Sequence, residues 1–190
     1  MKIVILNGSE KSDNTLDAIY EVIVDTLKKI GEVDTFILHD TKIASCLGCF
    51  NCWFKTPGIC IVDDAGRDVV MKVIQSDLTI FFTPVTFGGY SSELKKAVDR
   101  LLPLVLPFFT KINGEIHHKP RYEKYPCLLC VGVLPYPDEE SERIFSSLSE
   151  RNAINFYSPA HTSGVILNSQ SPEEIREEIE KLLIRMGVKI

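Results

Sequence analysis

Four cysteines lie within fifteen residues of the sequence, in the stretch CLGCFNCWFKTPGIC from Cys46 to Cys60, with the spacing C-x2-C-x2-C-x7-C. The two-residue spacers bring three sulfurs around one tight turn, and the fourth thiol can close a set of four ligands. Four such thiolates commonly hold an iron–sulfur cluster. Zinc sites more often use two C-x2-C pairs separated by a long loop, so zinc fits this spacing less well. A disulfide or redox-sensing role and an inert cysteine loop stay open as alternatives.

Composition narrows the setting of these thiols. The chain has 190 residues, a net charge of −5 and 45% hydrophobic residues, which predicts one globular domain over residues 1–190. No basic block stands out, so we expect no nucleic acid partner. No window approaches the roughly 18 apolar residues that cross a bilayer, so we expect no membrane partner and a cytoplasmic location. Cysteines stay reduced in the cytoplasm, which disfavours the disulfide alternative.

Strand and helix patterns alternate along the chain and must position the cysteine loop. Apolar runs predict five strands, at residues 2–7, 33–38, 78–85, 127–134 and 164–167. Amphipathic helices between them predict an α/β fold with a parallel sheet covered on both faces. One segment breaks the alternation: Asn113-Gly114 stands between two β-prone arms, which predicts a β-hairpin insertion near residues 107–120.

The loop after the first predicted strand, NGSEKSDNT (7–15), could bind an anion. It combines hydroxyl, amide and lysine side chains with a helix N-terminus, where free N–H groups and the helix dipole favour phosphate. It matches neither G-x-G-x-x-G nor G-x-x-x-x-G-K-[ST], which argues against a dinucleotide fingerprint and a P-loop. A plain polar loop that caps a helix is the alternative, and the acidic Glu10 and Asp13 count against phosphate binding.

The loop after the third predicted strand begins the stretch TPVTFGGYSSELKKAVDR (83–100). Gly88-Gly89 allows close approach of backbone to a flat ligand, and Phe87 and Tyr90 can stack on an aromatic ring. An ordinary glycine turn with two aromatics is the alternative. Outside these loops, we expect Cys127 and Cys130 to be small buried residues on opposite faces of a strand, and His117-His118 to lie on the surface.

Together these segments resemble a known family. GSEKSDNT resembles the phosphate loop of flavodoxin-like NAD(P)H-dependent FMN reductases, and TPVTFGGYSSELKKAVDR resembles their second flavin loop. The C-x2-C-x2-C-x7-C loop resembles the compact cysteine motif of the iron–sulfur flavoproteins in that superfamily. The resemblance spans residues 2–100 and implies a flavodoxin-like, doubly wound sheet with strand order 2-1-3-4-5.

The resemblance also implies cofactors and site residues. FMN would be held at its phosphate by Ser9, Lys11, Ser12, Asn14 and Thr15, and bordered at its isoalloxazine ring by Pro84, Val85, Thr86, Phe87, Gly88 and Gly89. A [4Fe-4S] cluster would be held by Cys46, Cys49, Cys52 and Cys60. The flavin would carry the chemistry, so no catalytic side chain is assigned.

The function that follows is an FMN-dependent oxidoreductase in which electrons pass between the cluster and FMN. NAD(P)H or a ferredoxin-type protein would be the electron donor, a small molecule or a protein the acceptor, and a homodimer or homotetramer the assembly. Two alternatives stay open: a cluster-free NAD(P)H-dependent reductase of flavins or quinones, and a non-enzymatic electron carrier of the flavodoxin type.

Overall fold

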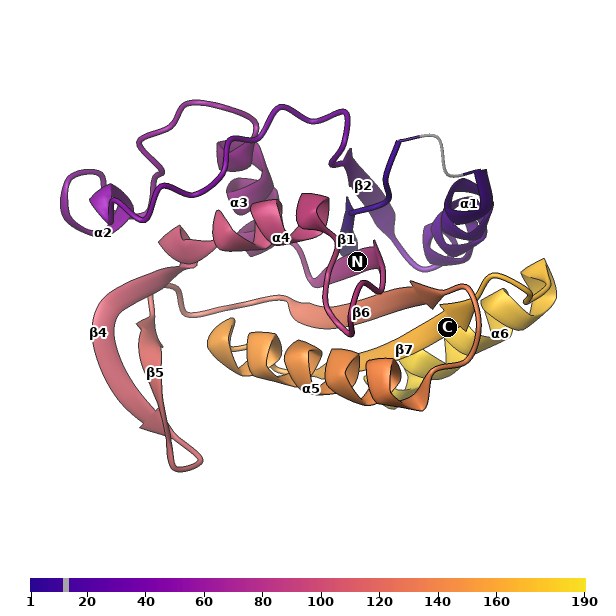
Figure 1. The fold of residues 1–190 in the computed structure, drawn as a ribbon. Coiled ribbons are helices and arrows are strands. Elements are labelled where there is room, and N and C mark those ends of the chain that lie inside the picture. Colours follow the sequence, from indigo (N-terminus) through magenta and orange to yellow (C-terminus); the bar gives the residue numbers. More distant parts are fainter. Residues whose placement is uncertain (12–13) are drawn as a thin grey trace.

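A five-stranded parallel sheet forms the centre of the computed structural model, which describes residues 1–11 and 14–190 (Figure 1). Its strands are β1 (Lys2–Asn7), β2 (Glu32–Ile37), β3 (Leu78–Pro84), β6 (Cys127–Leu134) and β7 (His161–Leu167). They lie in the order β2-β1-β3-β6-β7, and every neighbouring pair is parallel. This order differs from the predicted 2-1-3-4-5 in its labels, because β4 and β5 are the two strands of the separate hairpin.

Helices cover both faces of the sheet, as the alternation of patterns predicts. On one face, α1 (Asn14–Lys28) and α6 (Pro172–Arg185) pack together over an apolar core that includes Ile5 and Ile80. On the other face lie α3 (Gly66–Gln75), α4 (Ser92–Asp99) and α5 (Glu139–Asn155), over a second core around Leu6 and Phe81. Among the residues that the structure describes, no helix is both long and apolar enough to cross a membrane.

Local sequence signals fix the ends of several helices. Ser171 and Glu174 form a reciprocal capping box at the start of α6, in which each side chain accepts the other residue's backbone N–H. The Ser91 hydroxyl accepts the N–H of Leu94 at the start of α4. The carboxylate of Asp138 accepts two N–H groups at the start of α5. These caps set where the loops at the sheet edge end.

The hairpin consists of β4 (Val105–Ile112) and β5 (Glu115–Pro120), and it extends away from the sheet (Figure 1). Asn113 and Gly114 both have positive φ, of 49° and 92°, as a two-residue hairpin turn of type I′ requires. The predicted insertion is therefore present, and it begins two residues before residue 107. A four-residue helix, α2 (Asn51–Phe54), and a short 3₁₀ helix, η1 (Leu102–Leu104), lie at its base.

The expectation for the two cysteines of β6 is confirmed in their opposite faces, but only Cys130 is buried and Cys127 is half-buried. Cys127 packs against the α1–α6 core, whereas Cys130 is fully buried in the other core, so the two lie on opposite faces of β6. The expectation that both histidines of the hairpin lie on the surface is wrong. His117 is only 8% exposed, because its ring is held between Asn155 of α5, at 2.9 Å, and Glu115, at 3.2 Å.

Candidate functional site

The loops after β1 and β3 are joined by hydrogen bonds. The Ser91 hydroxyl donates to the carbonyl of Gly8 over 2.6 Å, and the Ser91 N–H donates to the hydroxyl of Thr83 over 2.9 Å. The Gly8 N–H in turn donates to the carbonyl of Phe82. Two segments that lie 83 residues apart in sequence therefore form one edge of a candidate site at the carboxyl end of the sheet, where ligands of such folds bind.

Gly8 makes this junction possible, because a side chain there has no room. A Cβ at this position would lie 2.6 Å from the Cβ of Leu94 and 2.8 Å from the hydroxyl oxygen of Ser91. We therefore expect Gly8→Ala to destabilise the protein by about 1–3 kcal/mol, as overpacking does. Urea denaturation measures the change. Gly89→Ala is the control, since the nearest atom to its Cβ is the carbonyl oxygen of Thr86 at 3.4 Å, and equal losses in the two variants would contradict the steric argument.

The predicted phosphate-binding residues differ in their surroundings. Ser9 is fully buried, its N–H donates to the side chain of Asn7, and its hydroxyl has no hydrogen-bond partner among the described residues. Lys11 is exposed, and Asn14 and Thr15 are exposed at the first turn of α1. Ser12 lies outside the described residues. The buried hydroxyl of Ser9 is the feature here that points to a missing acceptor or donor.

Thr86 to Gly89, in the second predicted loop, form a tight turn. Thr86 and Gly89 each donate their N–H to the carbonyl of the other. Between them, Phe87 and Gly88 both have positive φ, of 50° and 74°. The Phe87 side chain at the tip is 98% exposed. Pro84 and Val85 lead into the turn half-buried. The turn therefore presents a rigid backbone and an uncovered aromatic ring.

Tyr90, by contrast, is unavailable for the stacking that the sequence suggests. Its ring packs edge-on against Phe81 and Phe145, with ring centroids 5.9 Å apart in each pair. Its hydroxyl accepts a hydrogen bond from the side-chain amide of Asn152. Tyr90 is therefore a core residue that holds the second loop against α5.

All four cysteines of the loop line one pocket, of about 330 Å³ including space open to solvent. Cys46 and Cys49 are exposed, Cys60 is half-buried and Cys52 is buried. Burial raises the pKa of the Cys52 thiol, and negative charge on the neighbouring Cys60, Cys46 and Cys49 raises it further, because that charge repels the Cys52 thiolate. Within the described part of the chain, no three Cys, His, Asp or Glu side chains are close enough together to hold a single metal ion.

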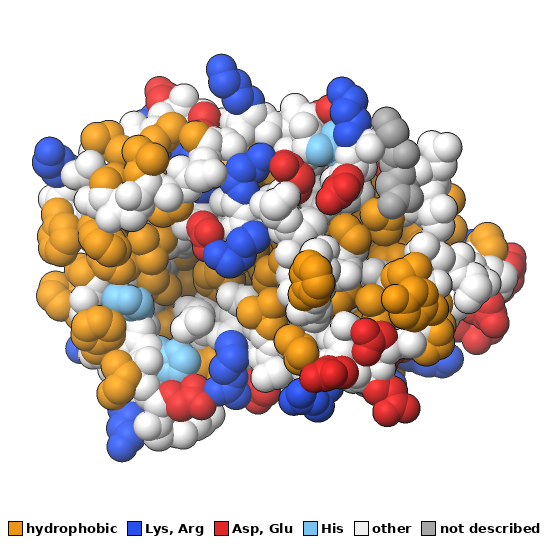
Figure 2. Space-filling model, in the orientation of Figure 1, with side chains coloured by type: hydrophobic (Ala, Val, Ile, Leu, Met, Phe, Trp, Pro, Cys, Tyr) orange, Lys and Arg blue, Asp and Glu red, His pale blue; other side chains and the backbone are white. Residues whose placement is uncertain are grey.

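The cysteine loop is fastened to the base of the hairpin. The indole N–H of Trp53 in α2 donates to the carbonyl of Val105 over 2.9 Å, and its ring packs on His118 of β5 with centroids 4.8 Å apart. Arg121, just after β5, donates to the carbonyls of Pro103 and Cys52 over 2.7 and 3.5 Å. Figure 2 shows hydrophobic side chains gathered over this part of the molecule. The exposed large hydrophobic residues of the cysteine loop and the hairpin include Leu47, Phe50, Phe54, Phe108, Phe109 and Ile116.

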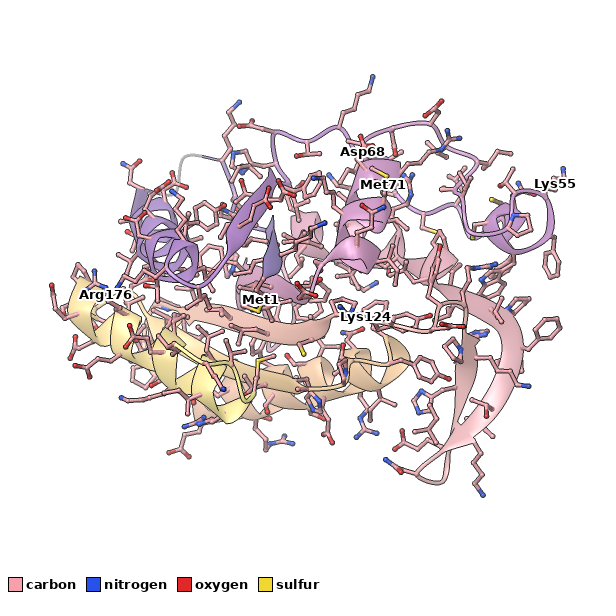
Figure 3. All side chains as sticks on the ribbon, turned by 180° about the vertical axis from the view of Figure 1, so that it is seen from behind. Met1, Lys55, Asp68, Met71, Lys124 and Arg176 are labelled. Atoms are coloured by element: carbon pink, nitrogen blue, oxygen red, sulfur yellow. The ribbon has the colours of Figure 1, made fainter. Side chains whose placement is uncertain are left out.

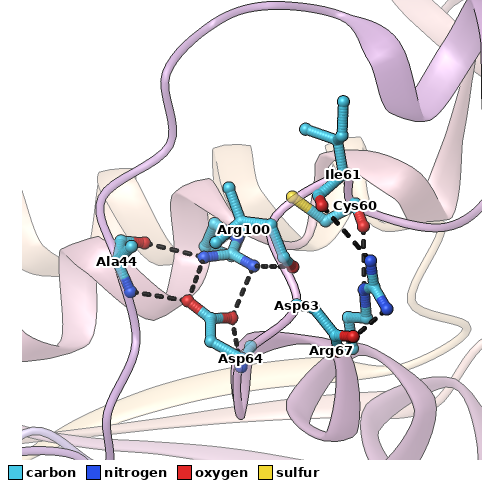
Figure 4. A network of polar contacts seen from close by, with 9 residues as sticks. Ala44, Cys60, Ile61, Asp63, Asp64, Arg67 and Arg100 are labelled. Atoms are coloured by element: carbon cyan, nitrogen blue, oxygen red, sulfur yellow. Dashed lines mark hydrogen bonds and ion pairs between the residues drawn. The ribbon is translucent and has the colours of Figure 1, made fainter.

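Arg100 forms the most deeply buried ion pair of this region (Figure 4). Its side chain is 1% exposed, and its two terminal nitrogens donate to both carboxylate oxygens of Asp64 over 2.7 and 2.9 Å. Burial alone would raise the pKa of Asp64, but hydrogen bonds from Arg100 and from the N–H groups of Ala44 and Gly66 outweigh it and lower the pKa to about 2. The pair therefore ties the start of α3 to the end of α4.

The two candidate sites lie apart within the chain. Figure 1 places α2 at one end of the molecule and the start of α1 at the other. From behind, Lys55 next to α2 and Arg176 on α6 likewise lie at opposite ends (Figure 3). The helix α4 connects the two regions: Ser91, at the flavin-type loops, caps its start, and Arg100, in the cysteine pocket, caps its end. Its eight residues rise about 12 Å at 1.5 Å per residue.

Comparison with known proteins identifies the family. A sequence model described as NADPH-dependent FMN reductase matches residues 1–121, which include both flavin-type loops and the cysteine loop. The chain belongs to this family. The resemblance noted in the sequence is thereby confirmed at the level of the FMN reductase family.

Curated relatives are named iron–sulfur flavoproteins. One from Methanocaldococcus jannaschii is 30% identical over 119 residues, which cover 61% of this chain and 61% of that protein. One from Archaeoglobus fulgidus is 35% identical over 101 residues, which cover 53% of this chain and 48% of that protein. The match thus reaches about half to three fifths of each relative's length.

Solved structures confirm the fold of this FMN reductase family member. An NAD(P)H:quinone oxidoreductase from Methanothermobacter marburgensis superimposes with a TM-score of 0.69, covering 97% of this chain and 96% of the other. At 12% identity, this likeness shows the fold alone.

Proposed function

We propose that the protein is a cytoplasmic FMN-dependent oxidoreductase that holds a [4Fe-4S] cluster in its cysteine loop. NAD(P)H or a ferredoxin-type protein is the electron donor in this proposal, and a small molecule or a protein is the acceptor. The assembly is a homodimer or homotetramer. The observation that carries the proposal is the single pocket lined by four thiols, in a member of the FMN reductase family whose curated relatives are named iron–sulfur flavoproteins.

The residues of the two joined loops fit FMN. The buried hydroxyl of Ser9 lacks a partner within residues 1–11 and 14–190 and lies just ahead of α1, where a phosphate would supply an acceptor. The exposed Lys11 adds positive charge nearby, and the turn from Thr86 to Gly89 can border a flat ring. Bound FMN supplies electron transfer, so this chain's own task is to bind the phosphate, orient the ring and limit access of water.

The cysteine loop fits a cluster in the chemistry of its donors. Cys46, Cys49, Cys52 and Cys60 face one pocket, and four thiolates are the usual ligand set of a [4Fe-4S] cluster. Gly48 and Phe50 have positive φ, of 62° and 55°, which turns the loop sharply between the first three cysteines. The aromatic rings of Phe50 and Trp53 stack with centroids 5.1 Å apart, and Phe50 lines the pocket beside the thiols.

Ser9→Ala tests the phosphate site. We expect FMN affinity to fall about tenfold or more, because a hydrogen bond to a charged group contributes about 1.5–3 kcal/mol. We expect the stability of the FMN-free protein to stay unchanged or to rise, because the substitution removes a buried hydroxyl that has no partner. Fluorescence titration with FMN and urea denaturation measure the two effects.

Ser76→Ala is the matched control for Ser9→Ala. The Ser76 hydroxyl is also buried, but it donates to the carbonyl of Val73 and contacts the hydroxyl of Thr79, away from the flavin-type loops. We expect this variant to lose stability and keep its FMN affinity. An FMN affinity that Ser9→Ala leaves unchanged would contradict the assignment of Ser9 to the phosphate.

Anaerobic purification, followed by a visible spectrum and by iron and flavin analysis, tests the function as a whole. We expect about four iron atoms and one FMN per chain, with a broad absorption shoulder near roughly 400 nm beside the flavin bands. Flavin without iron would leave a cluster-free NAD(P)H-dependent reductase. A colourless protein with stoichiometric zinc would overturn both cofactors. NAD(P)H oxidation with an added quinone then separates an enzyme from a carrier, since a carrier shows no turnover.

A further inference from the structure

Arg100 has one N–H group without an acceptor. Four of the five N–H groups of its guanidinium are accounted for: Nη1 donates to Ala44 and Asp64, and Nη2 donates to Val62 and Asp64. The fifth, on Nε, is buried and has no hydrogen-bond partner in the part of the chain that the structure describes. Leaving a buried donor unsatisfied costs about 1–3 kcal/mol, which makes a missing acceptor the natural explanation.

The surroundings of Arg100 indicate what this acceptor is. Arg100 lines the same pocket as the four thiols, together with the apolar Leu47, Ile61 and Leu102. The backbone carbonyls and the carboxylate within reach are already used by the terminal nitrogens. Sulfur is the acceptor type that the four cysteines bring to this pocket.

We propose that the Nε–H of Arg100 donates a hydrogen bond to sulfur of the cluster or of its cysteine ligands, and that it thereby raises the cluster's reduction potential. The inference rests on the proposed function, since it needs the cluster. Hydrogen bonds to the sulfurs set the potentials of such clusters. The reduced cluster carries one more negative charge than the oxidised one, so a cationic donor stabilises the reduced form more. Arg100 therefore adjusts the reduction potential of the cluster, and Asp64 holds the Arg100 side chain in position.

Arg100→Lys tests the proposal because it keeps the positive charge and removes the Nε donor. We expect the equilibrium constant for one-electron reduction of the cluster to fall about tenfold, which corresponds to a potential about 59 mV lower. An anaerobic spectroelectrochemical titration measures the potential, and iron analysis confirms that the cluster is present.

Arg67→Lys is the matched control. Arg67 also reaches the cysteine loop, but its Nε–H donates to the backbone carbonyl of Cys60 over 2.8 Å, and its terminal nitrogen pairs with the exposed Asp63. We expect Arg67→Lys to leave the equilibrium constant for one-electron reduction of the cluster within about twofold of the wild-type value. Equal shifts in both variants, or an unchanged potential in iron-loaded Arg100→Lys, would overturn the role of Arg100 and leave the cluster itself standing. An iron-free wild-type protein would instead overturn the proposed function.

A measurement on the protein with Arg100 intact covers the case in which Arg100→Lys fails to fold or to hold iron. In Arg67→Lys protein labelled with ¹⁵N at arginine Nε, the reduced cluster should show an electron-spin coupling to one ¹⁵N nucleus and to one exchangeable proton. Pulsed electron paramagnetic resonance in H₂O and D₂O detects both couplings. Their absence in iron-loaded protein would overturn the proposal.

Discussion

Cys52→Ala is expected to remove the iron and leave the FMN in place. Cys52 is the most buried of the four pocket cysteines, at 8% exposed, and it lies in α2, which Trp53 fastens to the hairpin. Without its thiolate, the pocket offers three sulfurs for four iron sites. The joined loops at Gly8 and Ser91 lie at the other end of α4, so FMN binding has no reason to change. Iron analysis and flavin fluorescence on the same sample measure the two contents.

Cys127→Ala provides the comparison for this result. Its thiol is half-buried on β6 and does not line the cysteine pocket. We expect this variant to keep both iron and FMN. Wild-type iron content in Cys52→Ala would show that the cysteine loop does not hold the cluster. Loss of iron in both variants would point to general damage from losing a thiol.

Asp64→Ala is expected to destabilise the protein by about 3–5 kcal/mol, because it leaves the buried guanidinium of Arg100 without its counter-charge. The neighbouring Asp63→Ala is the control. Asp63 is 83% exposed and pairs with Arg67 at the surface, so its removal should cost less than about 1 kcal/mol. Urea denaturation at neutral pH compares the two. Equal losses of stability in the two variants would contradict the claim that the buried pair of Asp64 and Arg100 is a main support of the cysteine pocket.

The effect of Asp64→Ala should also depend on pH in a defined direction. The pKa of Asp64 in the folded protein is about 2, below the usual value of 3.8. A lowered pKa means that the ionised carboxylate stabilises the folded state fully above about pH 4, and that this contribution is lost as the pH falls toward about 2. The difference in free energy of unfolding between wild type and Asp64→Ala should therefore shrink over that range. A constant difference would mean that the charge of Asp64 is not what stabilises the fold.

Most of the fold follows from local patterns. Strands Lys2–Asn7 and Cys127–Leu134 are predicted to the residue, because a strand buried on both faces is a continuous apolar run with clear ends. The start of α6 follows from Ser171 and Glu174, whose cap needs only residues three apart. β7 begins three residues before the predicted Gly164, because the polar residues from His161 to Ser163 pair with β6.

The site is predicted less completely, because its parts depend on contacts distant in sequence. The local sequence indicates that Asp64 caps a helix, and its carboxylate does accept the N–H of Gly66. Its main partner, however, is Arg100, which lies 36 residues later in the sequence. Ser91 reads as a cap for α4, and only the fold shows that its hydroxyl also holds Gly8. Sequence position places the cysteine loop after β2, on the ligand edge of the sheet, whereas the long connection carries it toward the hairpin (Figure 1).

The hydrogen bonds from Trp53 and Arg121 have a consequence for how this end of the protein opens. The cysteine loop cannot separate from the domain without breaking the bond from Trp53 to Val105 and the bond from Arg121 to the Cys52 carbonyl. We therefore expect the two segments to open as one cooperative unit in native-state hydrogen exchange. Iron bound by the cysteines would slow the exchange of amides in β4 and β5, strands that contribute none of its ligands.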